Sequence, residues 1–456
     1  MSEGLGLSRA LVGLTVPQVG LALLAGRWRP ATMDHPSLHE AQSPGKWPPQ
    51  PLGLARLAFI AFRGASLMPI AADMMRSLIA EPRNAATLMD LSTIHYLTGR
   101  PDVARSFQRQ ALAVEQVYRQ SPVCVGDGGV RLLMFATPGD FMANMPIQFI
   151  VDGTDITLDV LYVGSGVPLP RRLPEHDVLM LGIGESDQTR ELLAGLGPLM
   201  DNWSQPALND PRRVLSLSRD SLWQVLAGEP TIRIPATVRV DRPTLSRLAD
   251  GSLSVDAVLP GGRFPVILRP IGSHAGRGLE KLDGTAAMGG YLAIQEAETF
   301  YLSSYVDYRS EDGMFRKYRI AFIDGHPYVC HVAIAGHWML HYLNAGMWES
   351  EEKRAEEARI FETFEDDFVR RNAEALGGMA RRIGLEYFVV DCAVTRDDKV
   401  LVFEADIAMI LHAMEPCELF PYKAPQMRKV FEAFRDMLHR RVHHQDAGPP
   451  HGREGE

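Results

Sequence analysis

The chain contains 456 residues, 46% of them hydrophobic, and carries a formal net charge of -9 at neutral pH. This length predicts two or three domains with cores of their own. The acidic balance leaves no basic surface for a polynucleotide, so we expect no nucleic-acid partner. The four cysteines (Cys124, Cys330, Cys392 and Cys417) lie far apart and lack zinc-site spacing, which favours reduced thiols in a cytoplasmic protein.

An apolar stretch, LVGLTVPQVGLALLA, occupies residues 11–25. It is shorter than the ~20 residues that a membrane-spanning helix needs, and it contains Pro17. The acidic Glu3 precedes it, where a signal peptide carries basic residues. We therefore expect no membrane association and interpret residues 11–25 as a docking segment or a disordered start. Residues 29–52 are rich in proline and polar residues, which is linker composition, so residues 1–52 are expected to form a low-order segment.

Residues 53–121 show the apolar spacing of helices. Two helices are predicted within NAATLMDLSTIHYLTGRPDVARSFQRQALAV, joined at Gly99-Arg100-Pro101. The pair resembles a tetratricopeptide repeat, whose spacing is matched by Leu88, Leu91, Gly99, Ala104 and Ala111. The resemblance implies a module that binds a peptide or a carrier. The alternative is a helical hairpin that packs on the next domain.

The pattern changes after Val130, where strands alternate with helices. VRLLMFA, TLDVLYV and HDVLMLGIG are predicted strands, and SDQTRELLAGLG is a predicted helix. LNDPRRVLSLSRDSLWQVLAG then predicts a turn and a further helix. This alternation indicates a parallel α/β sheet.

A glycine-rich loop follows a predicted strand in FPVILRPIGSHAGRGLEKL. The loop contains Gly272, Ser273, His274, Gly276 and Gly278. Glycines let backbone N–H groups wrap around an anion, and Arg269, at the strand end, is placed to meet a phosphate oxygen. By itself the motif is weakly specific, since the chain contains 40 glycines and the loop lacks the pattern of a P-loop.

Two further strands form a predicted hairpin in KYRIAFIDGHPYVCHVAI, with Asp324-Gly325 at the turn. Arg319 lies among alternating apolar residues of the first strand, where it either faces a cleft or pairs with a carboxylate. The hairpin continues into HVAIAGHWMLHYLNAGMW. We interpret this segment as a packed element with satisfied polar groups. The alternative is that His341 or Asn344 orients a substrate carboxylate.

A third hairpin is predicted in DCAVTRDDKVLVFEAD, residues 391–406. A turn within RDDK pairs Arg396 with Lys399, and the same register places Asp391 opposite Glu404. Because strand side chains alternate between faces, Asp406 lies on the same face as Glu404. Like charges directly opposite each other destabilise a sheet, so these carboxylates need a counter-charge. Carboxylate oxygens of this kind suit Mg²⁺.

The order of these motifs resembles that of the ATP-grasp superfamily, which includes D-alanine–D-alanine ligase, glutathione synthetase and the ribosomal-protein glutamate ligases. A glycine loop, an arginine hairpin, a long helical stretch (Glu356 to Ile383) and the Asp…Glu-x-Asp hairpin follow one another before Phe434. The resemblance implies an α/β and α+β fold class, with an N-terminal helical hairpin module, a Rossmann-like pre-ATP-grasp domain and an ATP-grasp domain. The expected bounds of the three are residues 53–121, 122–231 and 232–436, and residues 437–456 are expected to form a disordered tail.

The same resemblance implies how a nucleotide binds. Its phosphates are assigned to Arg269, which stands where the family has lysine, and to the loop from Gly272 to Gly278. The adenine is assigned to Tyr305 and Val306, which follow the strand TFYLSS. The ribose is assigned to one of Asp307, Glu311 and Asp312.

Catalytic roles are implied as well. Arg319 is assigned to the transferred phosphate. Two Mg²⁺ ions are assigned to Asp391, Glu404 and Asp406, with Glu404 bridging the ions and Asp406 standing where the family has asparagine.

The activity that the resemblance implies is that of an ATP-dependent carboxylate–amine ligase, which forms an acyl phosphate and releases ADP and phosphate. The expected substrates are small-molecule or peptide carboxylates and amines, and a homo-oligomer is compatible with the sequence. Two alternatives stay open. One is a phosphotransferase that stops at the phosphorylated product, and the other is a catalytically silent nucleotide-binding protein whose helical module recruits a peptide partner.

Overall fold

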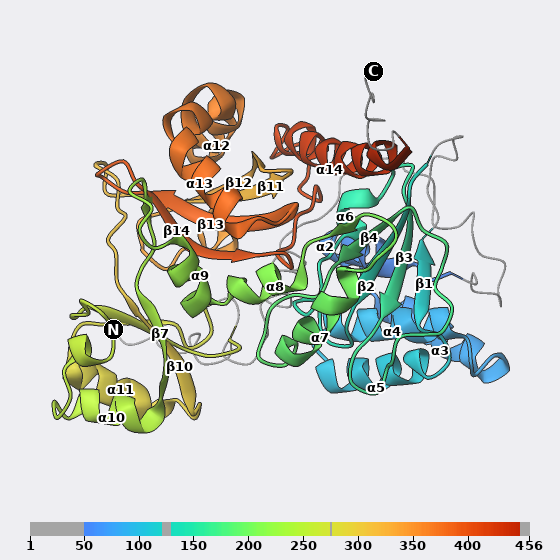
Figure 1. Ribbon diagram of the computed structural model, residues 1–456, viewed down its shortest axis with the longest axis horizontal. Coiled ribbons are helices and arrows are strands. Elements are labelled where there is room, and N and C mark those ends of the chain that lie inside the picture. Colours follow the sequence, from blue (N-terminus) through green and yellow to red (C-terminus); the bar gives the residue numbers. More distant parts are fainter. Residues whose placement is uncertain (1–49, 121–128, 274–275, 447–456) are drawn as a thin grey trace, which may run out of the picture. The chain divides into compact units, whose positions relative to one another are not determined.

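The computed structural model describes residues 50–120, 129–273 and 276–446 of the chain. The chain divides into two compact units, the first ending at Met180 and the second beginning at Leu181 (Figure 1). The domain boundaries predicted after residues 121 and 231 stay predictions. Most of the predicted N-terminal segment (1–49) and the end of the predicted tail (447–456), together with Cys124 and His274, lie outside the described residues.

The first unit combines helices with a sheet. Its elements, in chain order, are α2 (Gly53–Phe62), α3 (Met68–Ala80), α4 (Ala85–Leu97), α5 (Pro101–Leu112), β1 (Val117–Gln120), β2 (Arg131–Ala136), α6 (Gln148–Val151), β3 (Thr157–Tyr162) and β4 (Val178–Leu181). The strands lie in the order β1-β3-β2-β4. Strand β2 pairs with β3 in parallel, as the sequence predicts, and β1 pairs with β3 antiparallel. Residues 132–136 are all buried, which is typical of a strand covered on both faces.

Helices α4 and α5 confirm the predicted helical pair. Helix α4 begins after Asn84, whose side chain accepts a hydrogen bond from the Thr87 N–H group, and Pro101 starts α5. Nearly every side chain of α4 is buried, and α3 and α5 lie beside it (Figure 1). The resemblance to a tetratricopeptide repeat stays a prediction.

The helical pair and the sheet belong to the same compact unit. Gln108 on α5 exchanges two hydrogen bonds of 3.0 Å with the backbone of Gly139, in the loop after β2. Strand β1 adds residues 117–120 to the edge of the sheet. These contacts favour the alternative of a helical hairpin packed on the α/β region.

A buried carboxyl group holds the start of α2. Asp90, on α4, is 3% exposed and accepts hydrogen bonds from the backbone N–H groups of Leu52 (2.7 Å) and Gly53 (3.0 Å). The first N–H groups of a helix have no partner within it, so Asp90 satisfies donors of α2 from a neighbouring helix. Burial raises the pKa of Asp90 to about 7, although the two hydrogen bonds and the nearby Arg56 favour the carboxylate.

The second unit contains a smaller and a larger sheet. Its elements, in chain order, are α7 (Arg190–Met200), β5 (Ala207–Leu208), α8 (Pro211–Val214), η1 (Leu215–Leu217), α9 (Arg219–Leu226), β6 (Ile232–Arg233), β7 (Thr237–Asp241), α10 (Arg242–Ala249), η2 (Val255–Ala257), β8 (Val266–Pro270), β9 (Glu280–Leu282), α11 (Thr285–Ile294), β10 (Thr299–Ser304), β11 (Phe315–Ile323), β12 (His326–Ala335), η3 (Tyr342–Asn344), α12 (Glu351–Thr363), η4 (Phe364–Val369), α13 (Ala373–Ile383), β13 (Tyr387–Val394), β14 (Val400–Asp406) and α14 (Lys423–Asp446).

The smaller sheet has the strand order β7-β10-β8-β9. Helices α10 and α11 pack against each other and against this sheet (Figure 1). Their shared core includes Leu245 on α10, Leu268 on β8 and Phe300 on β10, which are all inaccessible to solvent. This core fixes the position of β8, which ends at the predicted glycine loop.

The larger sheet has the order β12-β11-β13-β14-β6 and contains both predicted C-terminal hairpins. Strands β11 and β12 turn at Asp324 (φ 50°) and Gly325 (φ 79°), which confirms the predicted turn. Left-handed backbone at both central positions is what a type I′ two-residue hairpin loop requires, and Asp-Gly tolerates it. Strand β6 joins the other edge in parallel with β14.

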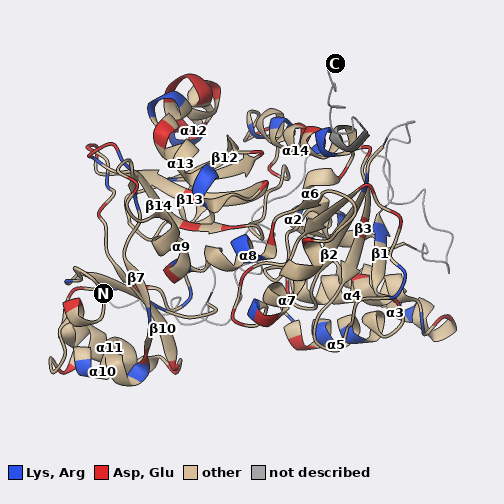
Figure 2. Cartoon of the chain, viewed as in Figure 1, with Lys and Arg blue, Asp and Glu red and all other residues tan. Residues whose placement is uncertain are grey.

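A long helical stretch precedes the third hairpin, as predicted. Helix α12 begins after Ser350, whose side chain accepts a hydrogen bond from the Lys353 N–H group, and a π-helical segment, η4, separates it from α13. Basic and acidic residues alternate along α12 in Figure 2. Gly384, with φ of +63°, ends α13 in the left-handed conformation.

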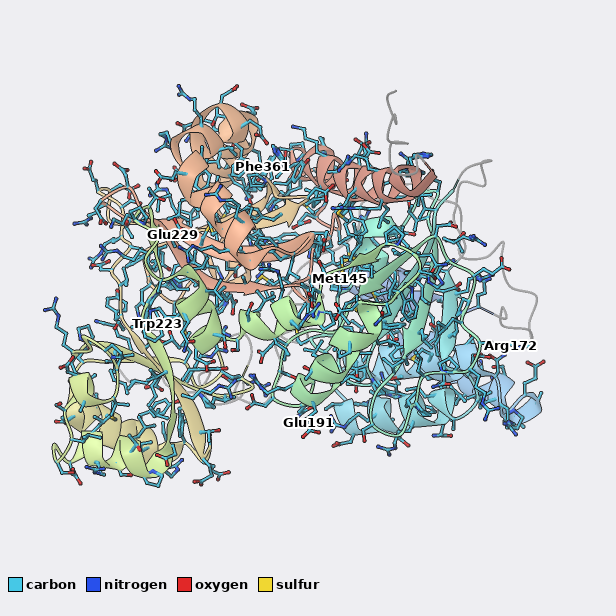
Figure 3. The ribbon with its side chains drawn as sticks, in the orientation of Figure 1. Met145, Arg172, Glu191, Trp223, Glu229 and Phe361 are labelled. Carbon is cyan, nitrogen blue, oxygen red and sulfur yellow. The ribbon has the colours of Figure 1, made fainter. Side chains whose placement is uncertain are left out.

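A buried ion pair joins α12, β12 and the start of α14. Glu357 is inaccessible to solvent and accepts hydrogen bonds from the Lys423 ammonium (2.7 Å) and the Val332 N–H group (2.8 Å). The hydroxyl groups of Tyr342 and Tyr422 also donate to it, at 3.0 and 2.7 Å. Phe361, labelled in Figure 3, lies on the same helix with the Lys423 ammonium 5.3 Å from its ring centre. Each buried charge therefore has partners.

The predicted disordered tail is wrong for its first ten residues. Helix α14 continues to Asp446, past the expected boundary at residue 436. Its apolar side chains keep helical spacing beyond that point, since Val430, Phe434, Met437 and Leu438 are all fully buried. Arg440 and Arg441 then pair with Asp324 at the hairpin turn.

No helix within the described residues is both long enough and apolar enough to cross a bilayer. Cys330, Cys392 and Cys417 are free thiols.

We predict that Asp90 makes stability depend on pH. The folded carboxyl group keeps its proton up to about pH 7, whereas the unfolded one loses it near the ordinary pKa of 3.8. The folded state therefore binds more protons within this window, and stability falls as the pH rises through it, by up to ~1.4 kcal/mol per pH unit. Asp90→Asn removes this component, so urea unfolding should show a smaller difference between wild type and variant at pH 7.5 than at pH 5. Equal differences at both values would contradict the assignment.

Candidate functional site

A row of four polar residues crosses the larger sheet. His331 on β12, Arg319 on β11, Asp391 on β13 and Glu404 on β14 are direct neighbours on successive strands. The predicted pairing of Asp391 with Glu404 is therefore confirmed. The row crosses strands whose other residues are mostly apolar, apart from charged residues such as Lys317 on β11 and Asp406 on β14.

A β-bulge lies beside this row in each hairpin. One extra residue, Cys330, interrupts β12 next to His331, and Phe403 interrupts β14 next to Glu404. At the tip of the third hairpin the Thr395 N–H group donates to the Lys399 carbonyl at 2.9 Å. The predicted pairing of Arg396 with Lys399 is therefore wrong, because the loop contains three residues rather than two. The bulge at Phe403 corrects the register by one residue before the row is reached.

Asp391 is the most tightly held carboxylate of the row. Its side chain is 1% exposed, and both oxygens accept hydrogen bonds from Arg319, at 2.8 and 3.0 Å. Lys317, two residues earlier on β11 and thus on the same face, donates to Oδ2 at 2.8 Å. Burial opposes ionisation, yet Arg319 and Lys317 hold the pKa of Asp391 well below its usual range. Arg319 was expected either to face a cleft or to pair with a carboxylate, and the structure shows that it pairs with Asp391.

Glu404 has a different counter-ion. Arg219, the first residue of α9, forms an ion pair with it across 185 residues of sequence. Glu404 is also more accessible, with its side chain 32% exposed. Burial and Asp391 raise its pKa, but Arg219 and Arg269 outweigh them and the pKa of Glu404 is lowered. The repulsion expected between Asp391 and Glu404 is therefore offset by separate cations on each.

Arg269 brings the smaller sheet into the same site. It is the penultimate residue of β8, is 8% exposed, and donates hydrogen bonds to the backbone oxygen of Ser273 and, at 3.3 Å, to its Oγ. Burial, and next the positive charge of Arg219, lower the pKa of Arg269 to about 9, while Glu404 opposes the shift. The strand-end cation of one sheet and the carboxylate row of the other therefore act on each other.

Three glycines of the loop adopt left-handed backbone. Gly272, Gly276 and Gly278 have φ of 72°, 72° and 62°, a region that other residues rarely adopt. The Gly278 carbonyl accepts a hydrogen bond of 2.6 Å from the Tyr291 hydroxyl. Ser273 is held by Arg269, as described above, so the loop is anchored on both sides of residues 274–275.

Asp406 is not gathered with Asp391 and Glu404 into a three-carboxylate cluster. Within the described ranges, no group of three or more His, Cys, Asp or Glu side chains is arranged to hold a metal ion. Asp406 accepts a hydrogen bond from the Ala408 N–H group at 2.9 Å, and burial raises its pKa to about 6. Its negative charge also contributes to the raised pKa of Glu185, which burial brings to about 7.

The residues predicted to contact adenine lie where β10 ends. The Lys281 ammonium is 4.8 Å from the centre of the Tyr305 ring, and the Trp338 ring meets the same ring edge-on at 5.9 Å. Val306 follows Tyr305 and is half-buried. Of the three acids predicted for the ribose, Asp307 pairs with Arg309 and Asp312 with Arg316.

Three cations of this site were not identified from the sequence: Arg219, Lys317 and Lys281. Lys317 carries a usable signal, because it precedes Arg319 by two residues and shares its face of a strand. Lys281 lies three residues past the glycine loop, on a strand next to β8. Arg219 gives no local signal, since only the packing of α9 places it beside Glu404. Trp223 of the same helix is labelled in Figure 3.

No protein-family model and no curated protein matches the chain. Among solved structures, a D-alanine–D-alanine ligase from Bacillus anthracis complexed with ATP is similar at 11% identity, covering 69% of this chain and 99% of that one, with a TM-score of 0.42. The VanG D-Ala:D-Ser ligase from Enterococcus faecalis is similar at 10% identity, with coverages of 69% and 99% and a TM-score of 0.43. The ATP-grasp ligase PsnB, complexed with a phosphomimetic variant of its minimal precursor, Mg and ADP, is similar at 12% identity, with coverages of 68% and 98% and a TM-score of 0.38. TM-scores of this size do not establish a common fold, so the function of the site is inferred from its own residues.

We predict that Asp391→Asn is severely destabilising. The substitution leaves Lys317 and Arg319 without their shared counter-charge in a buried position, which typically costs about 3–5 kcal/mol. Adding Lys317→Met should recover part of the loss, because one of the two stranded charges is then removed. Chemical unfolding of both variants would measure this.

A matched control is Asp367→Asn, which removes a carboxylate from an exposed pair with Arg371. Exposed pairs of this kind contribute roughly 0–1 kcal/mol, so its effect should be small. If the two aspartate variants lost the same stability, Asp391 would not be the buried counter-ion described here.

Proposed function

We propose that the chain is an ATP-grasp-type ligase that uses Mg²⁺-ATP to join a carboxylate to an amine. One observation carries the proposal. Arg219 of α9 pairs with Glu404 on β14, and the next residue, Asp220, pairs with Arg239 on β7, in the same sheet as β8, which carries Arg269 and leads into the glycine loop. A loop that suits phosphate and a carboxylate that suits Mg²⁺ thus belong to one site between two sheets of the same unit.

The charges of the site favour an anionic ligand. Four cations (Arg219, Arg269, Lys317 and Arg319) outnumber the three carboxylates of Asp391, Glu404 and Asp406. Phosphoryl transfer depends on positioning and on neutralising the charge that develops on phosphate oxygens, rather than on a protein nucleophile. We assign Arg269 and the backbone of the glycine loop to the ATP phosphates. Arg219 is a further candidate for a phosphate contact, because it pairs with Glu404 and its positive charge acts on Arg269.

The adenine and ribose are assigned to the end of β10. The Tyr305 ring, with Lys281 above it and Trp338 at its edge, supports this assignment because the group offers both stacking surface and hydrogen-bond donors. Val306 would supply backbone contacts. Asp307 is the nearer acid in sequence for a ribose hydroxyl, although Arg309 already pairs with it.

The donor set fits Mg²⁺ bound together with a nucleotide. Protein sites for Mg²⁺ commonly supply one or two carboxylates and leave the other positions to water and phosphate oxygens. Glu404 fits best, since its side chain is partly exposed, and Asp391 opposite it keeps lone pairs beyond those used by Lys317 and Arg319. Mg²⁺ would neutralise phosphate charge when bound. Asp406 lies next to Glu404 on the same face and is the weakest of the three assignments.

The proposed reaction has two steps. A carboxylate oxygen of the acid attacks the γ-phosphorus, the bond to the bridging oxygen breaks, and ADP leaves. An amine nitrogen then attacks the acyl carbon of the acyl phosphate, the carbon–oxygen bond breaks, and phosphate leaves while the nitrogen loses a proton. In this chain Arg319 would act from the centre of the row. It orients Asp391 and holds positive charge beside the transferred group.

We predict that Mg²⁺-ADP stabilises the protein and that Glu404→Gln removes most of this effect. A ligand that binds only the folded state at 100 times its Kd contributes ~2.7 kcal/mol. Thermal melts with Mg²⁺-ADP and with ADP plus EDTA would measure it. Glu418→Gln, which removes an exposed carboxylate, is the matched control and should keep the full shift. Equal shifts in both variants would remove Glu404 from the metal site.

The reaction itself is tested by ADP release from Mg²⁺-ATP in the presence of a panel of amino acids and peptides, with masses of the products. Hydroxylamine should trap an acyl phosphate as a hydroxamate. ADP formation without any dependence on amine would instead favour the phosphotransferase. If no acceptor supported ADP release while nucleotide still bound, the ligase proposal would fail and a nucleotide-binding interaction protein would be favoured.

A further inference from the structure

One ring nitrogen of His341 makes no hydrogen bond within the described fold. Its Nε2 is inaccessible to solvent and has no hydrogen-bond partner among the described residues. This differs from the sequence-based interpretation, in which the segment after β12 has satisfied polar groups. Leaving a buried polar atom unpaired costs free energy, so such an atom needs an explanation.

The backbone of His341 is held in place by Asn344. The His341 N–H group donates to the Asn344 side-chain oxygen at 2.8 Å, and the Asn344 side-chain amide donates to the Met339 carbonyl at 3.0 Å. The Asn344 N–H group returns a bond of 3.1 Å to the His341 carbonyl. Three hydrogen bonds therefore fix the short turn that carries the imidazole, which indicates a ring positioned by the fold.

The ring lies between the glycine loop and the polar row. A Cβ atom on Gly276 would lie 2.8 Å from His341 Nε2, so the imidazole occupies the space that glycine leaves at this position. The charged groups that act on the ring are Lys317 and Arg319 on β11, Asp391 on β13 and Glu404 on β14. If the loop holds phosphates and the row holds Mg²⁺, the terminal phosphoryl group belongs between the loop and the row, beside the imidazole.

We propose that His341 is a ligand-contacting residue of this site, whose Nε2–H group donates a hydrogen bond to an oxygen of the γ-phosphoryl group. The assignment rests on the proposed function. A phosphoryl oxygen suits the position because it is a strong hydrogen-bond acceptor, and the buried Nε2 atom has no other partner among the described residues.

The protonation state agrees with this role. Burial, and next the charge of Lys317, lower the pKa of His341 to about 4. The imidazole is therefore neutral near pH 7, and one of its nitrogens carries a proton that it can donate. A neutral donor adds a directed hydrogen bond to the site without adding a further charge beside Lys317.

Isothermal titration of the full chain with Mg²⁺-ADP and with a non-hydrolysable Mg²⁺-ATP analogue tests the proposal. His341→Leu should weaken binding of the triphosphate about tenfold, equivalent to ~1.4 kcal/mol, and leave ADP binding within about twofold. His341→Gln, which keeps an N–H donor near the Nε2 position, should retain most of the triphosphate affinity. His337→Leu, at an exposed histidine of the same segment, is the control and should match wild type.

A second readout does not depend on the variants. In the wild-type protein with labelled histidine, the His341 Nε2 resonance should shift with the triphosphate analogue and much less with ADP. Unchanged triphosphate affinity in His341→Leu, or equal losses for both nucleotides, would overturn the role of His341 alone. A wild-type protein that bound neither nucleotide would overturn the proposed function as well.

Discussion

The arrangement of the second unit depends on one electrostatic constraint: two carboxylates that face each other across β13 and β14 must each be neutralised. Asp391 is nearly inaccessible, and Lys317 and Arg319 of the adjacent strand hold it. Glu404 is reached by Arg219 from α9. Because α9 also pairs Asp220 with Arg239 of β7, consecutive residues of one short helix contact both sheets. The same charges that stabilise the larger sheet thus help to join it to the smaller one.

The parts of this structure that local chemistry determines could be predicted from the sequence. Asp324-Gly325 specifies a two-residue turn, and the period of two along strands places Asp391, Glu404 and Asp406 on one face. The glycines of the loop after β8 adopt the left-handed backbone for which glycine is suited. The bounds of helices α4 and α5 agree with local signals in the sequence: an N-cap residue, Asn84, before α4, and Gly99 and Pro101 between the two helices.

The parts that depend on tertiary packing could not be predicted. Arg219 and Glu404 are 185 residues apart in the sequence, and no local pattern around either residue predicts that they form an ion pair. The pairing of β1 with β3 joins residues 117–120 to the first sheet, and no local pattern in the sequence predicts this pairing. The sequence of helix α14 is polar and charged near its end, yet Met437 and Leu438 are fully buried and anchor this part of the helix by packing. Asp406 is the instructive case within the site: it shares a strand with Glu404, but burial, a backbone hydrogen bond and the charge of Glu404 set its environment.

The bulges at Cys330 and Phe403 separate the register of the polar row from that of the hairpin tips. Between the row and each tip, the partner strands are shifted by one residue relative to the pairing on the other side of the bulge. A loop can therefore gain or lose a residue at the tip while the row stays aligned, provided that the outer strand absorbs the difference. The alignment of the four positions across the row thus depends on the two bulges as well as on the number of residues at the tips.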